Sequence, residues 1–277
     1  MKIIPEKEIF KLLTDFDGQI GLLVQDLNTN QTFTLNKDLV FPAASTIKIP
    51  LLVYLLKKVE DGILDWNTPI LIEDHNRVSG TGILCELDKS IMLSPRSLAI
   101  LMITLSDNTA TNQIIDLVGL NEFNLFLKND LHLKDTVMMR KMLDFDAIKK
   151  GKNNYTSANE MGNLLIEIAN GKLISQWVCD EIINIMSKQQ FRNKLPAFIP
   201  AVPSWASEED KQNLKDDTVL VSNKTGDLTG IQHDIGIFRL PDNRKYIIAA
   251  FTKNLKQDSD GVILIGKISQ LIYESLK

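Results

Sequence analysis

A serine and a lysine three residues apart begin a strongly apolar helical stretch, in Ser45-Thr46-Ile47-Lys48. Residues i and i+3 share one face of a helix, so the Ser45 hydroxyl and the Lys48 amine can meet. A serine hydroxyl is a poor nucleophile unless a base takes its proton, and a lysine enclosed among apolar side chains can lose its charge and act as that base. The pair predicts nucleophilic catalysis. A capped helix with a solvated lysine is the alternative, because a chain of this length holds about one such pair by chance.

The triplet Ser106-Asp107-Asn108 stands where one predicted helix ends and the next begins. Ser106 could relay a proton to a leaving group, and Asn108 could hold a substrate amide. The alternative is ordinary helix capping, because Ser, Asp and Asn are the preferred cap residues. Taken alone, the triplet leaves both interpretations open.

The triplet Lys224-Thr225-Gly226 follows directly after a predicted strand over 218–223. A glycine near a strand end lets the backbone of a ligand approach closely. Lys224 and Thr225 then offer a cation and a hydroxyl to an anionic group. A strand that runs into a glycine turn is the alternative.

The three motifs together, in this order and each at a fitting junction, form the signature of class A β-lactamases and penicillin-binding proteins. The chain resembles the class A serine β-lactamase family over nearly its full length. The resemblance also covers the run LMITLSDNTATN at 101–112 and the strand that begins His233-Asp234-Ile235-Gly236. It implies a β-lactam or peptide-like substrate and no cofactor.

The resemblance also implies a role for each motif residue. Ser45 is acylated by the substrate carbonyl, Lys48 is the acylation base or its partner, and Ser106 passes the proton to the departing nitrogen. Substrate binding falls to Asn108 for an acylamide side chain, to Lys224, Thr225 and Gly226 at the carboxylate end, and to the backbone N–H groups of Ser45 and Asp227 as the oxyanion hole. Preorganised donors of this kind are worth about 3 kcal/mol each in the transition state.

One loop departs from the family pattern R-x-E-x-x-L-N, reading RKMLDFD from Arg140 to Asp146. Met142 stands where the family's glutamate activates the water that clears the acyl-enzyme, and methionine cannot take a proton from water. Asn154 replaces the aspartate that pairs with the loop's arginine. We therefore expect slow deacylation, unless a shifted loop aims Asp144 or Asp146 at the water.

A second departure is Asp227, directly after Gly226. A carboxylate there disfavours an anionic substrate unless it turns away or pairs with Lys224. No arginine lies between Gly226 and Phe238, so His233 is the only candidate in this stretch to offset the charge. This charge makes substrates other than carboxylated lactams more plausible.

The elements that must position these residues follow from the hydrophobic pattern. Helical periodicity predicts helices over 5–16, 47–59, 94–105, 108–119, 120–131, 157–171, 175–188 and 258–277. Ser157 and Glu160 are predicted to form a capping box. Alternating segments predict a hairpin of strands 19–26 and 31–35, and further strands over 218–223, 233–240 and 245–251. No periodicity holds over 138–156, which predicts a loop that is either functional or disordered.

Strands at both ends of the chain and helices between them predict an α/β (α+β) fold. The resemblance implies that this fold is of the β-lactamase/transpeptidase type. We expect one unit over 1–277, in which 1–42 and 218–277 form an antiparallel sheet with flanking helices. Residues 43–217 are expected to form a mostly helical part, with the site in the cleft between the two.

Composition narrows the remaining functions. The 277 residues are 44% hydrophobic and 24% charged, which excludes a disordered chain, and the net charge of −4 makes nucleic-acid or membrane binding unattractive. The two cysteines and three histidines lack metal-ligand spacing, so no metal is expected: Cys85, Cys179, His75, His132 and His233. The N-terminus is charged and has no apolar export run, which predicts a cytoplasmic protein. We also expect a monomer.

Three functions compete at this point. The first is a class A-like serine β-lactamase with slow deacylation, which the three intact motifs favour. The second is a serine peptidase or esterase acting on another amide or ester, which Asp227 and the missing glutamate favour. The third is a non-hydrolytic protein that traps penicillin as an acyl adduct and acts as a sensor, which Met142 favours.

Overall fold

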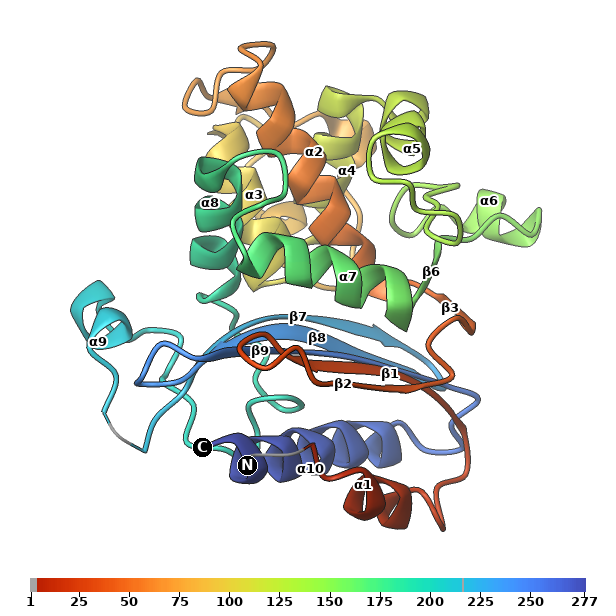
Figure 1. Cartoon of the computed structure of the whole chain (residues 1–277). Helices are drawn as coiled ribbons and strands as arrows, with labels where there is room; N and C mark the ends of the chain where they lie inside the picture. The colour runs from red at the N-terminus through yellow and green to blue at the C-terminus, as the bar shows by residue number, and fades with distance from the viewer. Residues whose placement is uncertain (1–3, 216) are drawn as a thin grey trace.

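A five-stranded antiparallel sheet of order β2-β1-β9-β8-β7 forms the centre of the molecule (Figure 1). The computed structural model describes residues 4–215 and 217–277. The strands are β1 (Gln19–Asp26), β2 (Thr32–Leu35), β7 (Leu220–Leu228), β8 (Ile231–Arg239) and β9 (Lys245–Lys253). The prediction that strands from both ends of the chain share one antiparallel sheet is confirmed.

Both faces of the sheet are covered, as the central strand β9 makes clear. Successive side chains of a strand point to opposite faces. Accordingly Ile247, Ala249 and Phe251 join the core on the side of the helical part, while Ile248 and Ala250 join the core on the other side. The first and last helices, α1 (Glu6–Leu12) and α10 (Asp258–Leu276), cover that second face, and α7 (Ala158–Ala169) lies across the first (Figure 1).

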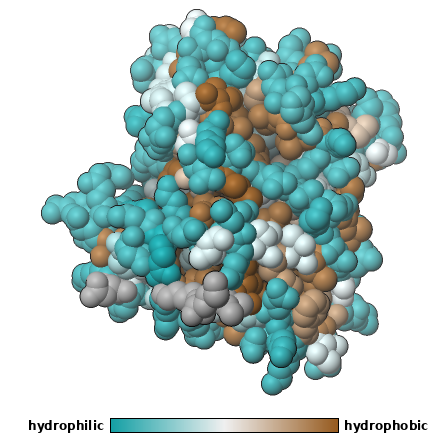
Figure 2. Space-filling view, viewed as in Figure 1, coloured by the Kyte–Doolittle hydropathy of each residue, from teal (hydrophilic) through white to brown (hydrophobic). Residues whose placement is uncertain are grey.

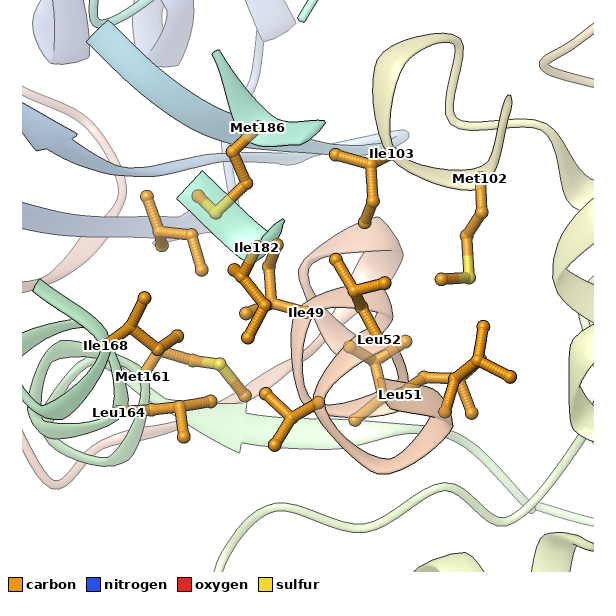
Figure 3. Packing of buried hydrophobic residues seen from close by; sticks show 14 of the residues in the cluster. Ile49, Leu51, Leu52, Met102, Ile103, Met161, Leu164, Ile168, Ile182 and Met186 are labelled. Carbon is orange, nitrogen blue, oxygen red and sulfur yellow. The ribbon is translucent and has the colours of Figure 1, made fainter. Parts of the chain in front are cut away.

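A bundle of helices stands on the α7 side of the sheet. Its members are α2 (Lys48–Glu60), α3 (Pro95–Thr104), α4 (Asn108–Val118), α5 (Leu120–Asn129) and α8 (Gln176–Met186). Figure 3 shows side chains of α2, α3, α7 and α8 pointing toward one another, among them Ile49, Met102, Leu164 and Ile182, all of which are buried. The apolar face of α2 is thus fixed on several sides, which makes its first turn a rigid support.

The helices α3, α7 and α8 each begin at a capping serine: Ser94, Ser157 and Ser175. Ser94 accepts a hydrogen bond from the Ser97 amide, and Ser157 accepts one from the Glu160 amide. The capping box predicted at Ser157 is only half correct. The Glu160 carboxylate does not complete the box. Its Oε1 accepts hydrogen bonds from the backbone amides of Lys134 and Asp135, at 2.5 and 2.9 Å.

Several element bounds differ from the predictions. The first helix is shorter than 5–16, and β7 continues through Lys224-Thr225-Gly226 to Leu228, so the motif lies within a strand and not after it. The segment 138–156 contains a short helix, α6 (Phe145–Lys149), and β6 (Tyr155–Ser157) begins at its end and pairs with β3 (Val40–Pro42). The short helix α9 (Glu208–Gln212) was not predicted, since it is one polar turn without an apolar face. The remaining small elements are β4 (Ile70–Leu71), β5 (Met92–Leu93) and the 3₁₀ turns η1 (Ala44–Ile47), η2 (Asp74–Asn76) and η3 (Leu84–Glu86).

The surface seen from the direction of Figure 1 is mostly hydrophilic, with hydrophobic residues gathered over its middle (Figure 2). Among the described residues, we find no helix that is both long enough and apolar enough to cross a bilayer. The division of the chain at 42/43 and 217/218 remains a prediction from the sequence.

Candidate active site

Ser45 lies in the tight turn η1, which leads directly into α2. The residue before it, Ala44, has a φ of 45°, a conformation that an alanine rarely adopts and that costs about 1–3 kcal/mol. Strand β7 lies against this turn, and a Cβ on Gly226 would come within 3.2 Å of both Ala44 and Thr46. The glycine of the third motif therefore lets the strand pack closely against the side chains on either side of the serine.

The Lys48 ammonium is fully buried and directed at the second motif. Its Nζ donates to Ser106 O at 2.7 Å, Ser106 Oγ at 3.1 Å and Asn108 Oδ1 at 3.0 Å. Burial lowers the pKa of Lys48 well below its ordinary value, the nearby Lys224 charge lowers it further, and Asp107 opposes the shift. A lysine with such a pKa can give up a proton and accept one. A direct hydrogen bond between Ser45 and Lys48 is not among those formed by the described residues.

Ser106 joins the two buried lysines. Its Oγ accepts from Lys48 Nζ and from Lys224 Nζ, each at 3.1 Å. Its φ of 53° is strained for a serine and turns its carbonyl toward Lys48 and Thr81, which also donates to it at 2.7 Å. Such strain persists only where the surroundings over-determine it. The arrangement suits a hydroxyl that relays protons between amines.

Asp107 caps a helix, whereas Asn108 contacts Lys48 and lines the cavity. Asp107 caps α4 through the Ala110 amide and also accepts from the amides of Ile83 and Leu84, so its role is structural. Asn108 holds Lys48 with its Oδ1 and lines the same cavity as Ser45. The structure thus shows capping by Asp107, while the binding of a substrate amide by Asn108 stays a prediction.

The Lys224 side chain is buried within the sheet edge and points at the same hydroxyl. Nζ donates to Thr225 O at 2.9 Å as well as to Ser106 Oγ. The pKa of Lys224 is lowered to about 7, mainly by burial. The charges of Asp227 and Asp234 oppose this shift, and the charge of Lys194 adds to it. Lys224 can therefore change its charge near neutral pH.

Asp227 has a partner that sequence reasoning missed. Its Oδ1 accepts from Lys194 Nζ at 2.6 Å, and the Lys194 side chain is fully buried. The suggestion that His233 offsets the charge is wrong: burial lowers the pKa of His233 to about 4, so its ring is neutral at pH 7. The ring is used structurally, with Nδ1 accepting from the Thr252 amide and Nε2 donating to Pro42 O at 2.8 Å.

The loop that lacks the family's glutamate is held firmly. Asn112 clamps the backbone of Met142, since Oδ1 accepts from the Met142 amide at 2.8 Å and Nδ2 donates to the Met142 carbonyl at 3.2 Å. Asn154 accepts from the amide of Arg140, and the Arg140 guanidinium donates to Asn153 Oδ1 at 2.8 Å. Amides thus replace the arginine–aspartate ion pair, and Met142 is held at the cavity wall.

The two aspartates offered as substitutes for the glutamate lie on α6. Asp144 caps that helix through the Ala147 amide, and Asp146 is exposed and lies 3.8 Å from Lys149. Neither lines the cavity that contains Ser45. The loop conformation in this structure therefore does not support a role for either in activating water.

A cavity of about 440 Å³ contains Ser45, Ser106, Asn108 and Thr225 on its polar side. The cavity also has an apolar part of its lining, formed by Met142, Leu143, Phe145, Ile148, Phe191 and Leu228. This size and this mixture are typical of a small-molecule site. Among the described residues that line it, the only carboxylate is that of Asp227, and we find no group of three or more side chains of the described chain that could hold a metal ion.

The structure brings the three motifs together, as predicted, and adds residues that the motifs did not reveal. Lys194 carries no sequence signal, because its partner Asp227 is 33 residues away. Gly80 and Thr81, which lie outside the three motifs, also border the cavity. The apolar loop residues lacked periodicity and could only have been identified once the loop was placed.

The comparisons with known proteins agree with this geometry. A family model described as "Beta-lactamase enzyme family" matches residues 4–276. The chain belongs to the beta-lactamase enzyme family. It is similar to beta-lactamase SME-1 of Serratia marcescens, with 28% identity over 98% of this chain and 88% of that protein.

Two solved structures are also similar to this chain. A beta-lactamase from Sphaerobacter thermophilus has 27% identity and a TM-score of 0.83, covering 97% of this chain and 96% of that chain. The protein PBP-A has 28% identity and a TM-score of 0.83, covering 97% and 94%. A leucine-to-glutamate mutant of PBP-A has been solved as an acyl-enzyme complex with penicillin G. The family, the fold and the class of serine β-lactamase-like hydrolase are confirmed for this chain.

Proposed function

We propose that Ser45 is acylated by β-lactams and that the acyl-enzyme is released slowly. The observation that carries this proposal is the convergence of Lys48 and Lys224 on Ser106 Oγ, each at 3.1 Å, beside Ser45 in one cavity. The acyl-enzyme of the PBP-A mutant with penicillin G supports it.

In the acylation step the Ser45 oxygen forms a bond to the lactam carbonyl carbon and its proton passes to neutral Lys48. The protonated Lys48 then gives a proton to Ser106, and the Ser106 hydroxyl gives its own to the lactam nitrogen as the C–N bond breaks. The hydrogen bond of 3.1 Å between Lys48 Nζ and Ser106 Oγ is the path for that transfer. The backbone N–H groups of Ser45 and Asp227 are the proposed donors to the oxyanion.

Substrate binding uses the remaining motif residues. Lys224 and Thr225 are proposed to attract the carboxylate of the lactam, with Gly226 leaving room for the approach. Asn108, at the cavity wall, is proposed to bind the acylamide group. The apolar wall, which includes Phe145 and Ile148, favours a substrate with an apolar acyl side chain over a charged one.

Slow release follows from the side chains that line the cavity beside Ser45. Hydrolysis needs a base that takes a proton from water, and Met142 supplies none. The single carboxylate among the described lining residues, Asp227, is held in an ion pair with Lys194 at 2.6 Å. The lack of a free base in the cavity also supports a second candidate function, in which the protein traps penicillin and signals its presence. The cytoplasmic location, the monomeric state and the absence of nucleic-acid or membrane partners remain predictions.

A time course of protein mass with penicillin G tests the proposal. The full chain is expected to gain one penicillin within minutes and to lose it over hours, while Ser45→Ala gains none. Loss of the adduct within minutes would support an ordinary β-lactamase. An adduct that is not lost would support the penicillin-trapping protein. If the wild-type chain gains no mass and turns over no chromogenic lactam, the proposal is wrong, and a peptidase or esterase on other substrates becomes the better hypothesis.

Acylation by anionic lactams is expected to weaken as the pH rises through about 7. Below its pKa of about 7, Lys224 carries the positive charge that attracts the substrate carboxylate; above it, Lys224 is neutral and that attraction is lost. The measurement is the second-order rate of adduct formation between about pH 6 and about pH 9, with penicillin G and its neutral methyl ester. The ratio of the two rates should fall across this range, and a constant ratio would contradict the role of Lys224.

A further inference from the structure

The ion pair between Lys194 and Asp227 connects the protein interior to the mouth of the active-site cavity. The Lys194 side chain is 0% exposed, whereas the Asp227 side chain is 53% exposed. Lys194 follows α8 in the chain, outside all three motifs, and Asp227 lies in β7 directly after Gly226. One end of the pair is therefore enclosed and the other faces the space that a substrate enters.

Three oxygens surround the Lys194 ammonium. Nζ donates to Asp227 Oδ1 at 2.6 Å, to His233 O at 3.2 Å and to Gly226 O at 3.4 Å. An ammonium has three N–H donors, so this set can use all of them. All three acceptors belong to residues of the strands β7 and β8, which fixes the cation against the edge that carries Lys224 and Thr225.

The unequal exposure of the pair determines its effect on a substrate. A carboxylate at the rim of an anion-binding cavity repels an incoming anion, and this repulsion grows as water is excluded. A buried cation within 2.6 Å of that carboxylate cancels most of the field it would produce at the cavity. The Asp227 charge also acts on Lys224, but among the described residues it is Lys194 that donates a hydrogen bond to the Asp227 side chain, so Lys194 neutralises this carboxylate most directly.

We propose that Lys194 is a specificity-determining residue, which admits anionic substrates to the cavity by neutralising Asp227. The inference rests on the proposed function, because it concerns the substrates that acylate Ser45. Lys194 touches neither Ser45 nor the reacting atoms, so it is a positioning residue. The departure at Asp227 then does not exclude carboxylated lactams, since its compensating charge comes from a distant part of the chain.

The test compares an anion with a neutral molecule of nearly the same shape, penicillin G and its methyl ester. The measured quantity is the ratio of their rates of adduct formation on Ser45, for the wild-type chain, Lys194→Met, Asp227→Asn and the double variant. Lys194→Met leaves the Asp227 charge unpaired, so the ratio should fall about tenfold. In the double variant both charges are gone, and the ratio should return to within about threefold of the wild-type value.

The outcomes separate the inference from the proposed function. If the wild-type chain is acylated by neither compound, the proposed function fails first. If the wild-type chain is acylated and Lys194→Met lowers both rates equally, or neither, Lys194 has only a structural role and the inference is overturned. Failure of the double variant to restore the ratio overturns it as well. Should Lys194→Met not fold, Lys194→Gln serves in its place, because its amide can still donate to Asp227 without a charge.

Discussion

Replacing Met142 with glutamate is expected to shorten the lifetime of the Ser45 acyl-enzyme by about a hundredfold. The Met142 backbone is held on both sides by Asn112, so the new side chain should enter the cavity wall where the methionine now lies. A glutamate there can take a proton from water that attacks the acyl carbonyl. The measurement is the decay of the penicillin G adduct by mass spectrometry after removal of free penicillin.

The matched control is Met142→Gln, which has the shape of the glutamate variant but no basic oxygen. It should release the adduct at nearly the wild-type rate. If the glutamine variant is as fast as the glutamate variant, the gain comes from water entering the cavity and not from a base. If the glutamate variant is acylated normally but released no faster, the missing carboxylate is not what limits release. The melting temperature of each variant shows whether the loop tolerates the polar group.

The three motifs could be recognised because each is short, and the first two lie where a predicted helix begins or ends. Ser45 precedes an apolar helix, and Asp107 caps the next helix of its motif. The sheet could be predicted from alternating strands, and the helices from their apolar period. What these rules share is that all their evidence lies within a few residues of the chain.

The remainder of the site depends on contacts between distant segments. Lys194 meets Asp227 only because the segment after α8 returns to the edge of β7, and no local pattern announces that return. The predicted end of β7 was wrong for a related reason. A charged residue such as Lys224 usually ends a buried strand, but here its ammonium donates a hydrogen bond to Ser106, which lies between two helices, and the strand continues. The strained backbone at Ala44 and Ser106 likewise follows from tertiary packing.

The roles of the two buried lysines can be separated by one further substitution. Replacing Lys48 with methionine is expected to slow acylation of Ser45 about a thousandfold, with penicillin G and with its methyl ester alike. Lys48 is proposed to take the proton in every acylation, whatever the charge of the substrate. The measurement is the rate of adduct formation at saturating substrate.

Lys224→Met is the comparison, because Lys224 lies at the same distance of 3.1 Å from Ser106 Oγ. Its proposed role is to attract the substrate carboxylate, so its loss should slow penicillin G far more than the methyl ester. An acylation rate of Lys48→Met within tenfold of wild type would transfer the role of base to Lys224. Lys48→Met removes a buried donor from Asn108 Oδ1 and from Ser106 O, which keeps the Thr81 hydroxyl. Its melting temperature is therefore measured alongside, and Lys48→Gln retains a donor should the methionine variant unfold. Equal loss with both substrates in Lys48→Met, beside unequal loss in Lys224→Met, is the result that assigns proton transfer to one lysine and anion binding to the other.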